Sequence, residues 1–128
     1  MIDKALDLTE RLIPTLDAAT HMGAFNRTDT RATLERFQRH GILIVKDYGL
    51  IGGVIGCSPI NRSHLIAFEG VFYAERGFRT LIEEFEAWGA SQGARIVALS
   101  CFSPRIGKIY EQLGYARLET YYTKEIRL

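Results

Sequence analysis

The chain has 128 residues, of which 47% are apolar and 24% are charged, with 16 basic and 15 acidic side chains. That length and composition predict a single globular domain spanning residues 1–128, and the balanced charge, without any basic run, argues against nucleic-acid binding. No apolar stretch approaches the length of a membrane span and no signal-peptide pattern opens the chain, so we expect a cytoplasmic protein that does not enter a membrane.

The first half of the chain predicts helices followed by a hairpin. Asp7 and Glu10 have the spacing of a capping box at the start of a helix, and Pro14 falls inside that helix as a kink or a later start. Two apolar runs separated by a short turn predict antiparallel strands. The expected elements are a strand at residues 2–5, a helix from Asp7 to residue 19, a helix from residue 28 or 29 to 39, and strands at residues 41–46 and 50–57.

The second half alternates strands and helices. Its clearest helix follows Gly77, because apolar side chains recur there along one helical stripe. An apolar run before Pro104 predicts a buried strand. The expected elements are a long strand at residues 64–73, the helix after Gly77, a strand at residues 95–102, a helix at residues 104–113, and a strand hairpin from residue 115 to the C-terminus.

The two cysteines, Cys57 and Cys101, fall in apolar strand-like runs. Buried free cysteines behave as small apolar side chains, and they persist as thiols in a reducing compartment. With three scattered histidines, the cysteines do not form a metal-ligand spacing. We therefore expect packed free thiols and no metal site.

Glu69 is the first candidate for chemistry. In the expected strand it alternates in register with Ala67, Val71 and Tyr73, and a lone carboxylate on such an apolar face is costly. Burial raises the pKa of a carboxyl group, which then becomes a base near neutral pH. The competing interpretation is a carboxylate that is paired structurally or reaches solvent beside the strand.

Tyr110 and the turn before the third helix are the other candidates. Tyr110 follows Ile109 on a short helix, so it is either a core aromatic or a phenol that donates a proton. At Arg76-Gly77 a strand passes directly into a helix, whose free N–H groups suit a pyrophosphate. Arg76 and Arg79 either add charge-assisted hydrogen bonds there or are simply solvated.

Four local signatures, taken in order, resemble the GNAT superfamily of N-acetyltransferases, in particular its small bacterial and phage-encoded members. The resemblance covers most of the chain and implies an α/β (α+β) domain with a mixed, centrally splayed sheet flanked by helices on both faces. The signatures are the hairpin 42–45 with 52–56, Glu69-Gly70-Val71-Phe72-Tyr73 leading through Glu75-Arg76-Gly77 into a helix, Ala87-Trp88 followed by residues 92–99, and Tyr110-Glu111-Gln112-Leu113-Gly114-Tyr115.

The resemblance implies transfer of an acetyl group from acetyl-CoA, as co-substrate, to a primary amine of a small molecule or protein, by direct attack in a ternary complex. It makes Glu69 the base and Tyr110 the acid that protonates the departing thiolate. Proteins of this resemblance often form homodimers. The residues that it assigns to the cofactor are Val71, Phe72 and Tyr73 for the thioester carbonyl and Arg76, Gly77, Phe78 and Arg79 for the pyrophosphate. Ser103 either contacts the cofactor arm or caps the last helix, and capping is the better interpretation.

The segment 73–81 departs from the family pattern. It contains one glycine, Gly77, where the family has several, and Phe78 stands where a small residue is expected. Fewer glycines leave less room for backbone N–H groups to wrap a pyrophosphate. This departure keeps a different class open, a non-catalytic GNAT-fold module that binds a protein. A second enzyme hypothesis keeps the fold and coenzyme but uses a longer acyl group.

Overall fold

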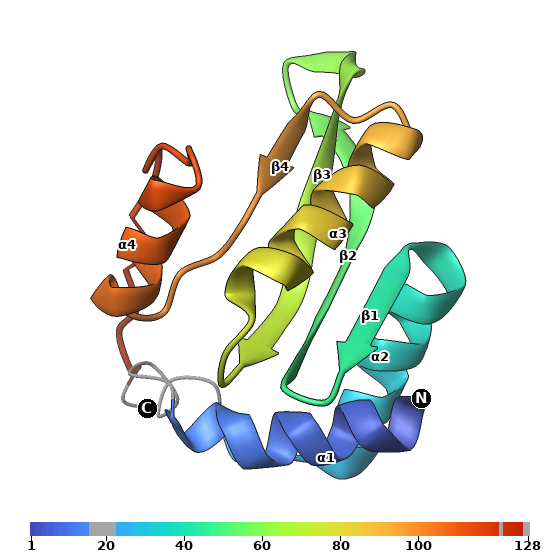
Figure 1. The fold of residues 1–128 in the computed structure, drawn as a ribbon, viewed down its shortest axis with the longest axis vertical. Helices are drawn as coiled ribbons and strands as arrows, with labels where there is room; N and C mark the ends of the chain where they lie inside the picture. The colour runs from blue at the N-terminus through green and yellow to red at the C-terminus, as the bar shows by residue number, and fades with distance from the viewer. Residues whose placement is uncertain (16–22, 121, 127–128) are drawn as a thin grey trace.

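The computed structural model of the protein describes residues 1–15, 23–120 and 122–126. It contains a sheet with strand order β1-β2-β3-β4 and helices on both faces (Figure 1). This α+β arrangement confirms the predicted fold class. The elements are α1 (Ile2–Leu12), the 3₁₀ turn η1 (Ile13–Thr15), α2 (Arg27–His40), β1 (Ile42–Lys46), β2 (Gly49–Ser58), β3 (Asn61–Ala74), α3 (Phe78–Ser91), β4 (Ile96–Ala98) and α4 (Pro104–Gln112).

The sheet is mixed and opens on one side. β1, β2 and β3 are antiparallel, whereas β4 runs parallel to β3. The β3–β4 ladder ends at the pair Phe68–Ala98, although β3 continues to Ala74. Beyond that pair the chain runs away from β3 toward α4 (Figure 1). The predicted splay is therefore present, and it leaves the second half of β3 with an open edge.

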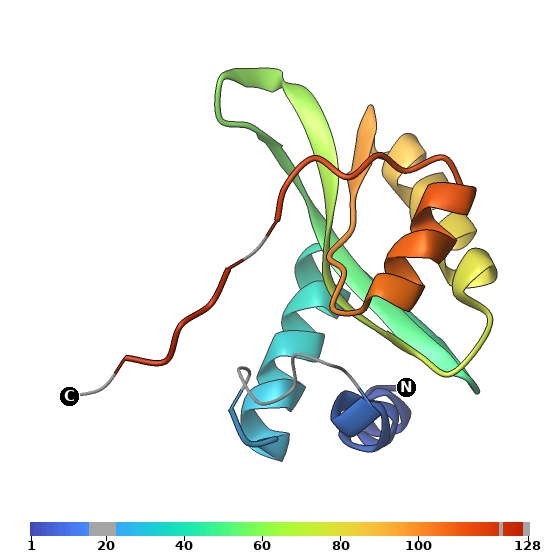
Figure 2. The ribbon, with the colours of Figure 1, turned by 90° about the vertical axis from the view of Figure 1, so that its left-hand side faces the viewer.

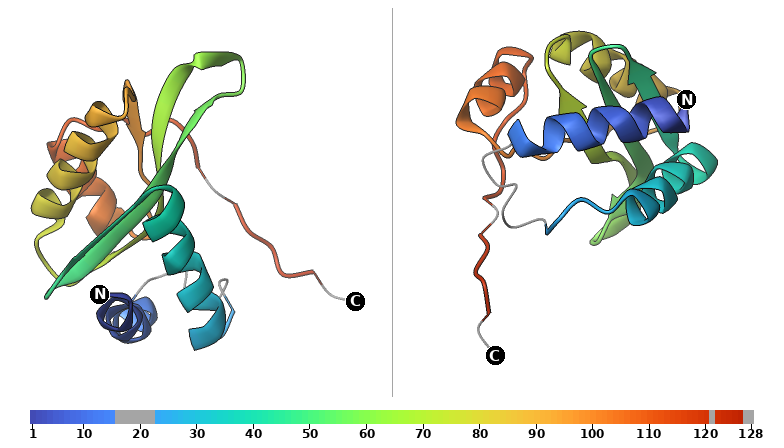
Figure 3. Two further views of the ribbon diagram at one scale, coloured as in Figure 1. Left: turned by 90° about the vertical axis from the view of Figure 1, so that its right-hand side faces the viewer. Right: turned by 90° about the horizontal axis from the view of Figure 1, so that it is seen from below.

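Two groups of helices cover the two faces of the sheet (Figure 3). The α1/α2 face is built on leucines, including Leu6, Leu34 and Leu50, all with no exposed surface. On the other face, Phe85 of α3 is fully buried and packs with Ile51 and Ala67. Tyr110 of α4 packs beside it with Phe78 and Ile82. Each helix therefore buries one apolar stripe against the sheet, as amphipathic helices do.

A β-bulge interrupts β3 next to Glu69. Gly52 pairs with Val71 but Gly53 pairs with Glu69, which leaves Gly70 as an extra residue. A bulge of one residue reverses the facing of the side chains beyond it. Val71 and Tyr73 accordingly pack in the α1/α2 core, whereas Ala67 packs on the α3 face. The expected common face with Glu69 is therefore confirmed for Ala67 and wrong for Val71 and Tyr73.

The N-terminal prediction is also wrong in part. Residues 2–5 begin α1 rather than a strand, because Ala5, Leu8 and Leu12 recur at helical spacing and all three are buried. Asp7 and Glu10 do not form a capping box. They lie within α1 and accept hydrogen bonds from Arg27 at 3.1 and 3.5 Å.

The segment after α4 lacks the predicted hairpin. Residues 115–120 and 122–126 contain no strand or helix, and the later part of this segment extends away from the rest of the molecule (Figure 2). Leu118, Tyr122 and Ile126 are 79–89% exposed. A strand needs a neighbour to pair with its N–H and C=O groups, and the described part of the chain supplies none here.

Two smaller expectations need correction. Cys57 and Cys101 are free thiols, as predicted, but both are exposed rather than packed. Cys57 lies near the end of β2 and Cys101 in the segment between β4 and α4. None of the described helices combines the length and apolar character needed to cross a bilayer.

Candidate active site

Glu69, Ser100 and Tyr110 meet where β3 and β4 separate. The backbone N–H of Ser100 donates to Glu69 Oε1 at 3.0 Å. The Tyr110 hydroxyl donates to the carbonyl oxygen of Ser100 at 2.9 Å. One residue of main chain thus links the predicted base on β3 to the predicted acid on α4.

The bulge makes this meeting possible. Glu69 pairs with Gly53, whose face of the sheet points at the Phe85 ring of α3. Phe72, two residues beyond the extra Gly70, packs on the same side against α3 and α4. In a regular strand, residues 69 and 72 would face opposite sides because side chains alternate. The bulge therefore gives Glu69 and Phe72 a common face, which is the face that carries Tyr110.

Burial controls the protonation of Glu69. The half-buried carboxyl group loses water, which raises its pKa from the ordinary 4.5 to about 7, and the Ser100 N–H opposes part of that rise. Across the described residues, no ion pair involves Glu69. A carboxyl group with this pKa is half ionised near neutral pH and gains a proton readily, as a general base must.

Tyr110 is held rigidly and keeps its proton. Its side chain is 7% exposed, and its ring stacks on Phe72 with centroids 6.2 Å apart and planes 8° apart. Burial raises the pKa of Tyr110 well above its usual range, and the negative charge of Glu69 raises it further. Near neutral pH the phenol is therefore protonated while Glu69 is partly ionised, so the predicted base and the predicted acid coexist in those forms.

Phe72 provides the main-chain donor at the open edge. The Glu75 N–H donates to the Tyr48 carbonyl at 3.0 Å, on the β2 side. Hydrogen-bonded pairs alternate along an antiparallel ladder, so the N–H groups of Tyr73 and Val71 also face β2. The intervening N–H of Phe72 points to the opposite edge, which β4 does not reach. Of the three predicted donors, Phe72 is thus the one placed for a ligand.

The predicted pyrophosphate turn lies at the start of α3. Gly77 is the N-cap residue, and no side chain caps the first turn of the helix. Arg76 and Arg79 are 68% and 76% exposed. Arg76 pairs with Glu75 at 3.4 Å and Arg79 with Glu83 at 2.8 Å. Exposed pairs of this kind are worth at most about 1 kcal/mol, so both guanidinium groups can exchange these partners for phosphate oxygens.

We predict that Gly77→Ala lowers the free energy of unfolding by about 2 kcal/mol, more than a left-handed alanine alone costs. Gly77 has φ of +69°, and a Cβ atom there would overlap the Tyr48 ring. Gly114→Ala is the matched control, because Gly114 has φ of +94° but no atom within 4 Å of the added Cβ. It should cost about 1 kcal/mol. If urea unfolding shows equal losses of stability for the two variants, the Tyr48 ring moves aside without a measurable cost and the prediction is wrong.

Phe78 and Ser103 contribute differently from the sequence-based expectation. Phe78 is 9% exposed and packs edge-on against Phe72 at 5.7 Å, so its backbone N–H, and not its ring, is available to a ligand. Ser103 is the N-cap residue of α4, but its side chain makes no cap hydrogen bond. Its carbonyl oxygen instead accepts from the Cys101 thiol at 2.9 Å. The preferred capping role is therefore not confirmed.

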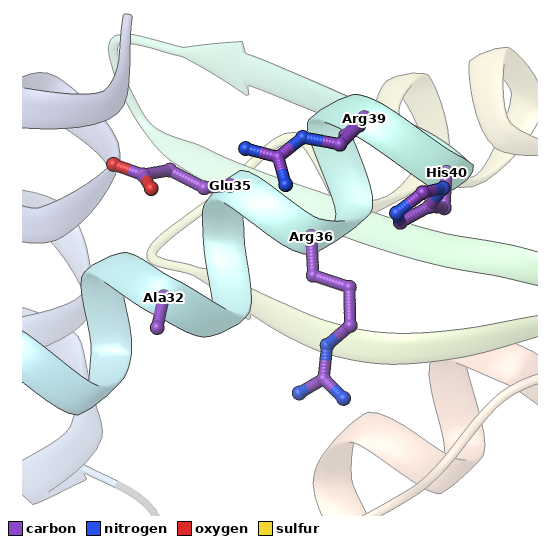
Figure 4. A pocket seen from close by; sticks show the side chains of 5 residues that line it. All are labelled: Ala32, Glu35, Arg36, Arg39 and His40. Carbon is purple, nitrogen blue, oxygen red and sulfur yellow. The ribbon is translucent and has the colours of Figure 1, made fainter.

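A surface hollow lies elsewhere, on α2 (Figure 4). It is lined by Ala32, Glu35, Arg36, Arg39 and His40. All five belong to one helix, and none is a predicted site residue. We therefore exclude this hollow from the candidate site.

Ser100 is the site residue that the sequence did not reveal. It takes part through its main-chain N–H and C=O groups, which every residue except proline possesses. Ser100 could have been recognised only by its position just beyond the end of the β3–β4 ladder. The sequence instead predicted that the strand containing Ser100 continues to residue 102. No residue-type signal was available.

The sequence matches no protein-family model, and no curated protein matches it. Solved structures do match. The aminoglycoside N-acetyltransferase AAC(6')-Iy in complex with CoA is 19% identical, with a TM-score of 0.70 over 99% of this chain and 89% of its own. Glucosamine-6-phosphate N-acetyltransferase from Arabidopsis thaliana is 14% identical, with a TM-score of 0.67 over 99% and 95%. A transcriptional regulator from Bacillus halodurans is 11% identical, with a TM-score of 0.69 over 94% and 93%.

Proposed function

We propose that this chain, which has the fold of the GNAT N-acetyltransferases, transfers an acetyl group from acetyl-CoA to a primary amine. The observation that carries the proposal is the link from Glu69 through Ser100 to Tyr110 at the open edge of β3. It joins a carboxyl group with a pKa of about 7 to a phenol that keeps its proton. Aminoglycosides and glucosamine 6-phosphate are the acceptors named for two structural relatives, and the acceptor amine of this chain is a separate question.

In the proposed reaction the amine nitrogen attacks the carbonyl carbon of the thioester directly. Glu69 accepts a proton from the amine, and the N–H of Phe72 donates to the carbonyl oxygen as negative charge develops on it. The carbon–sulfur bond then breaks. Tyr110 gives its proton to the departing sulfur and is reprotonated from solvent, while Glu69 releases the amine proton to solvent, so the protons balance.

Cofactor binding rests on the start of α3. The free N–H groups of its first turn and the positive end of the helix dipole suit a pyrophosphate, and Arg76 and Arg79 add two cations. The open edge of β3 adjoins this turn, since β3 ends at Ala74 and α3 begins at Phe78. A ligand that binds the turn with its phosphates can therefore extend along β3 toward Glu69.

Calorimetric titration with acetyl-CoA tests the proposal. We expect saturable binding, weakened roughly tenfold in each of the Arg76→Ala and Arg79→Ala variants, since a charge-assisted hydrogen bond is worth about 1.5 kcal/mol or more. Arg62→Ala, a change in the exposed start of β3, should leave affinity unchanged. The absence of binding at millimolar acetyl-CoA would contradict the enzyme proposal and favour the non-catalytic binding module. Higher kcat/KM with a longer acyl thioester would instead favour the second enzyme hypothesis.

A further inference from the structure

We propose that Ser100 is the positioning residue of this site, its N–H group holding the Glu69 carboxylate and its carbonyl holding the Tyr110 hydroxyl. The inference deepens the proposed function and rests on it for its catalytic consequence. The two hydrogen bonds themselves are features of the fold, at 3.0 and 2.9 Å.

The place of Ser100 in the sheet explains why its main chain is available. The pairs Ile66–Ile96 and Phe68–Ala98 would continue, in a regular parallel ladder, to a pair between residues 70 and 100. That pair does not form, because Gly70 is the extra residue of the bulge and the strands separate at the same point. The N–H of Ser100 has lost its strand partner, and the Glu69 side chain replaces it.

The arrangement also keeps acid and base apart. A phenol that donated directly to Glu69 would spend its proton on the base and leave none directed at another group. Here Tyr110 donates to the Ser100 carbonyl, and Glu69 accepts from the Ser100 N–H. Each side chain is oriented by a main-chain group that does not titrate. Ser100 therefore fixes the spacing of the pair without joining their protonation states through a shared proton.

Among the groups around Glu69, Ser100 is the one whose contact favours the ionised carboxylate. Burial opposes ionisation, and the Ser100 hydrogen bond is the cause that lowers the pKa of Glu69. The other titratable groups nearby are the phenols of Tyr73 on β3 and Tyr110 on α4, whose pKa values the Glu69 charge raises. The Cys101 thiol acts on Tyr110 in the same direction. The two phenols, with pKa values raised above their usual range, are neutral at pH 7 and below, so neither replaces the N–H.

Nuclear magnetic resonance of the intact chain tests the contact without requiring activity. We expect the Ser100 amide signal to shift with pH with the same midpoint as the Glu69 carboxyl carbon, near 7. Glu69→Gln should abolish the pH-dependent step at Ser100. Tyr110→Phe should preserve the step and move the Ser100 carbonyl carbon signal. A Ser100 amide that does not change while Glu69 titrates would overturn the proposal.

Substitution at Ser100 tests the consequence. Ser100→Ala keeps the N–H and should leave the Glu69 midpoint where it is, whereas Ser100→Pro removes the N–H and should raise that midpoint by roughly one unit. The acid limb of the kcat profile should move by the same amount, lowering kcat at pH 7 roughly fivefold. An unchanged midpoint in a folded Ser100→Pro variant would refute the positioning role. If the Ser100→Pro variant does not fold, the pH titration of the Ser100 amide signal tests the contact with Glu69 in its place. The same titration tests the contact if the wild-type protein transfers no acetyl group.

Discussion

Replacing Tyr110 with phenylalanine is expected to lower kcat for acetyl transfer by roughly 10²–10⁴-fold, the range that a general acid supplies. The ring should remain in place, because it stacks on Phe72 and packs with Phe78 and Ile82. What is lost is the hydroxyl proton for the departing sulfur. Affinity for acetyl-CoA, measured by calorimetry, should change less than twofold, since no cofactor-binding group is removed.

Tyr115→Phe is the matched control for that variant. Tyr115 lies 6.0 Å from Tyr110 between ring centroids, and its hydroxyl donates to Glu86 at 2.8 Å. The control therefore also removes one tyrosine hydroxyl and one hydrogen bond from the same aromatic cluster. We expect it to retain most of its kcat. A Tyr110→Phe enzyme as fast as the Tyr115→Phe enzyme would exclude Tyr110 as the acid.

Glu69→Gln is expected to abolish most of the activity and to stabilise the protein at high pH. The loss of the base should lower kcat at pH 8 by roughly 10²–10⁴-fold. A pKa raised from 4.5 to about 7 means that the folded state binds this proton more tightly than the unfolded state. The Glu69 contribution to stability is therefore full below pH 4.5 and falls as pH rises to 7, by about 3 kcal/mol in all.

The glutamine variant should thus gain stability relative to the wild type as pH rises between 4.5 and 7, and the gain should level off above pH 7. Urea unfolding at pH 4, 6 and 8 measures this difference. Glu111→Gln, the same substitution at an exposed position of α4, is the matched control for exchanging a carboxyl group for an amide. A wild type that becomes no less stable, relative to Glu69→Gln, between pH 4 and pH 8 would show that Glu69 titrates normally in the folded protein.

The elements with strong periodic patterns could be predicted from the sequence. The hairpin β1–β2 and the helix α3, with its buried Phe85, appear where the pattern placed them. The errors fall where local pattern was ambiguous. Residues 2–5 are too few for their periodicity to distinguish a strand from a helix, and they begin a helix that buries Ala5. The segment after Tyr115 alternates like a strand yet has no pairing partner among the described residues, and pairing is a long-range property.

Site residues were predictable where their chemistry depends on side-chain type. A carboxylate within an apolar strand and a tyrosine on a short helix identified Glu69 and Tyr110, which the structure brings to either side of Ser100. The face of the sheet on which Val71 and Tyr73 lie was not predictable, because it depends on the bulge. The only trace of the bulge in the sequence is Gly70, whose lack of a side chain leaves room for the Phe37 ring. The role of Ser100 was hidden for a different reason, since its groups belong to the backbone.

The extra residue in β3 divides that strand into two segments with opposite phase. Deleting Gly70 would remove no side chain that takes part in the proposed chemistry, yet it would restore one continuous alternation along the strand. Either Glu69 would then turn to the α1/α2 side, or Phe72 would leave the face that supports Tyr110. The proposed chemistry therefore depends on the number of residues in β3 as well as on their identity. We expect a sequence of similar composition that lacks one residue here to lose the candidate site.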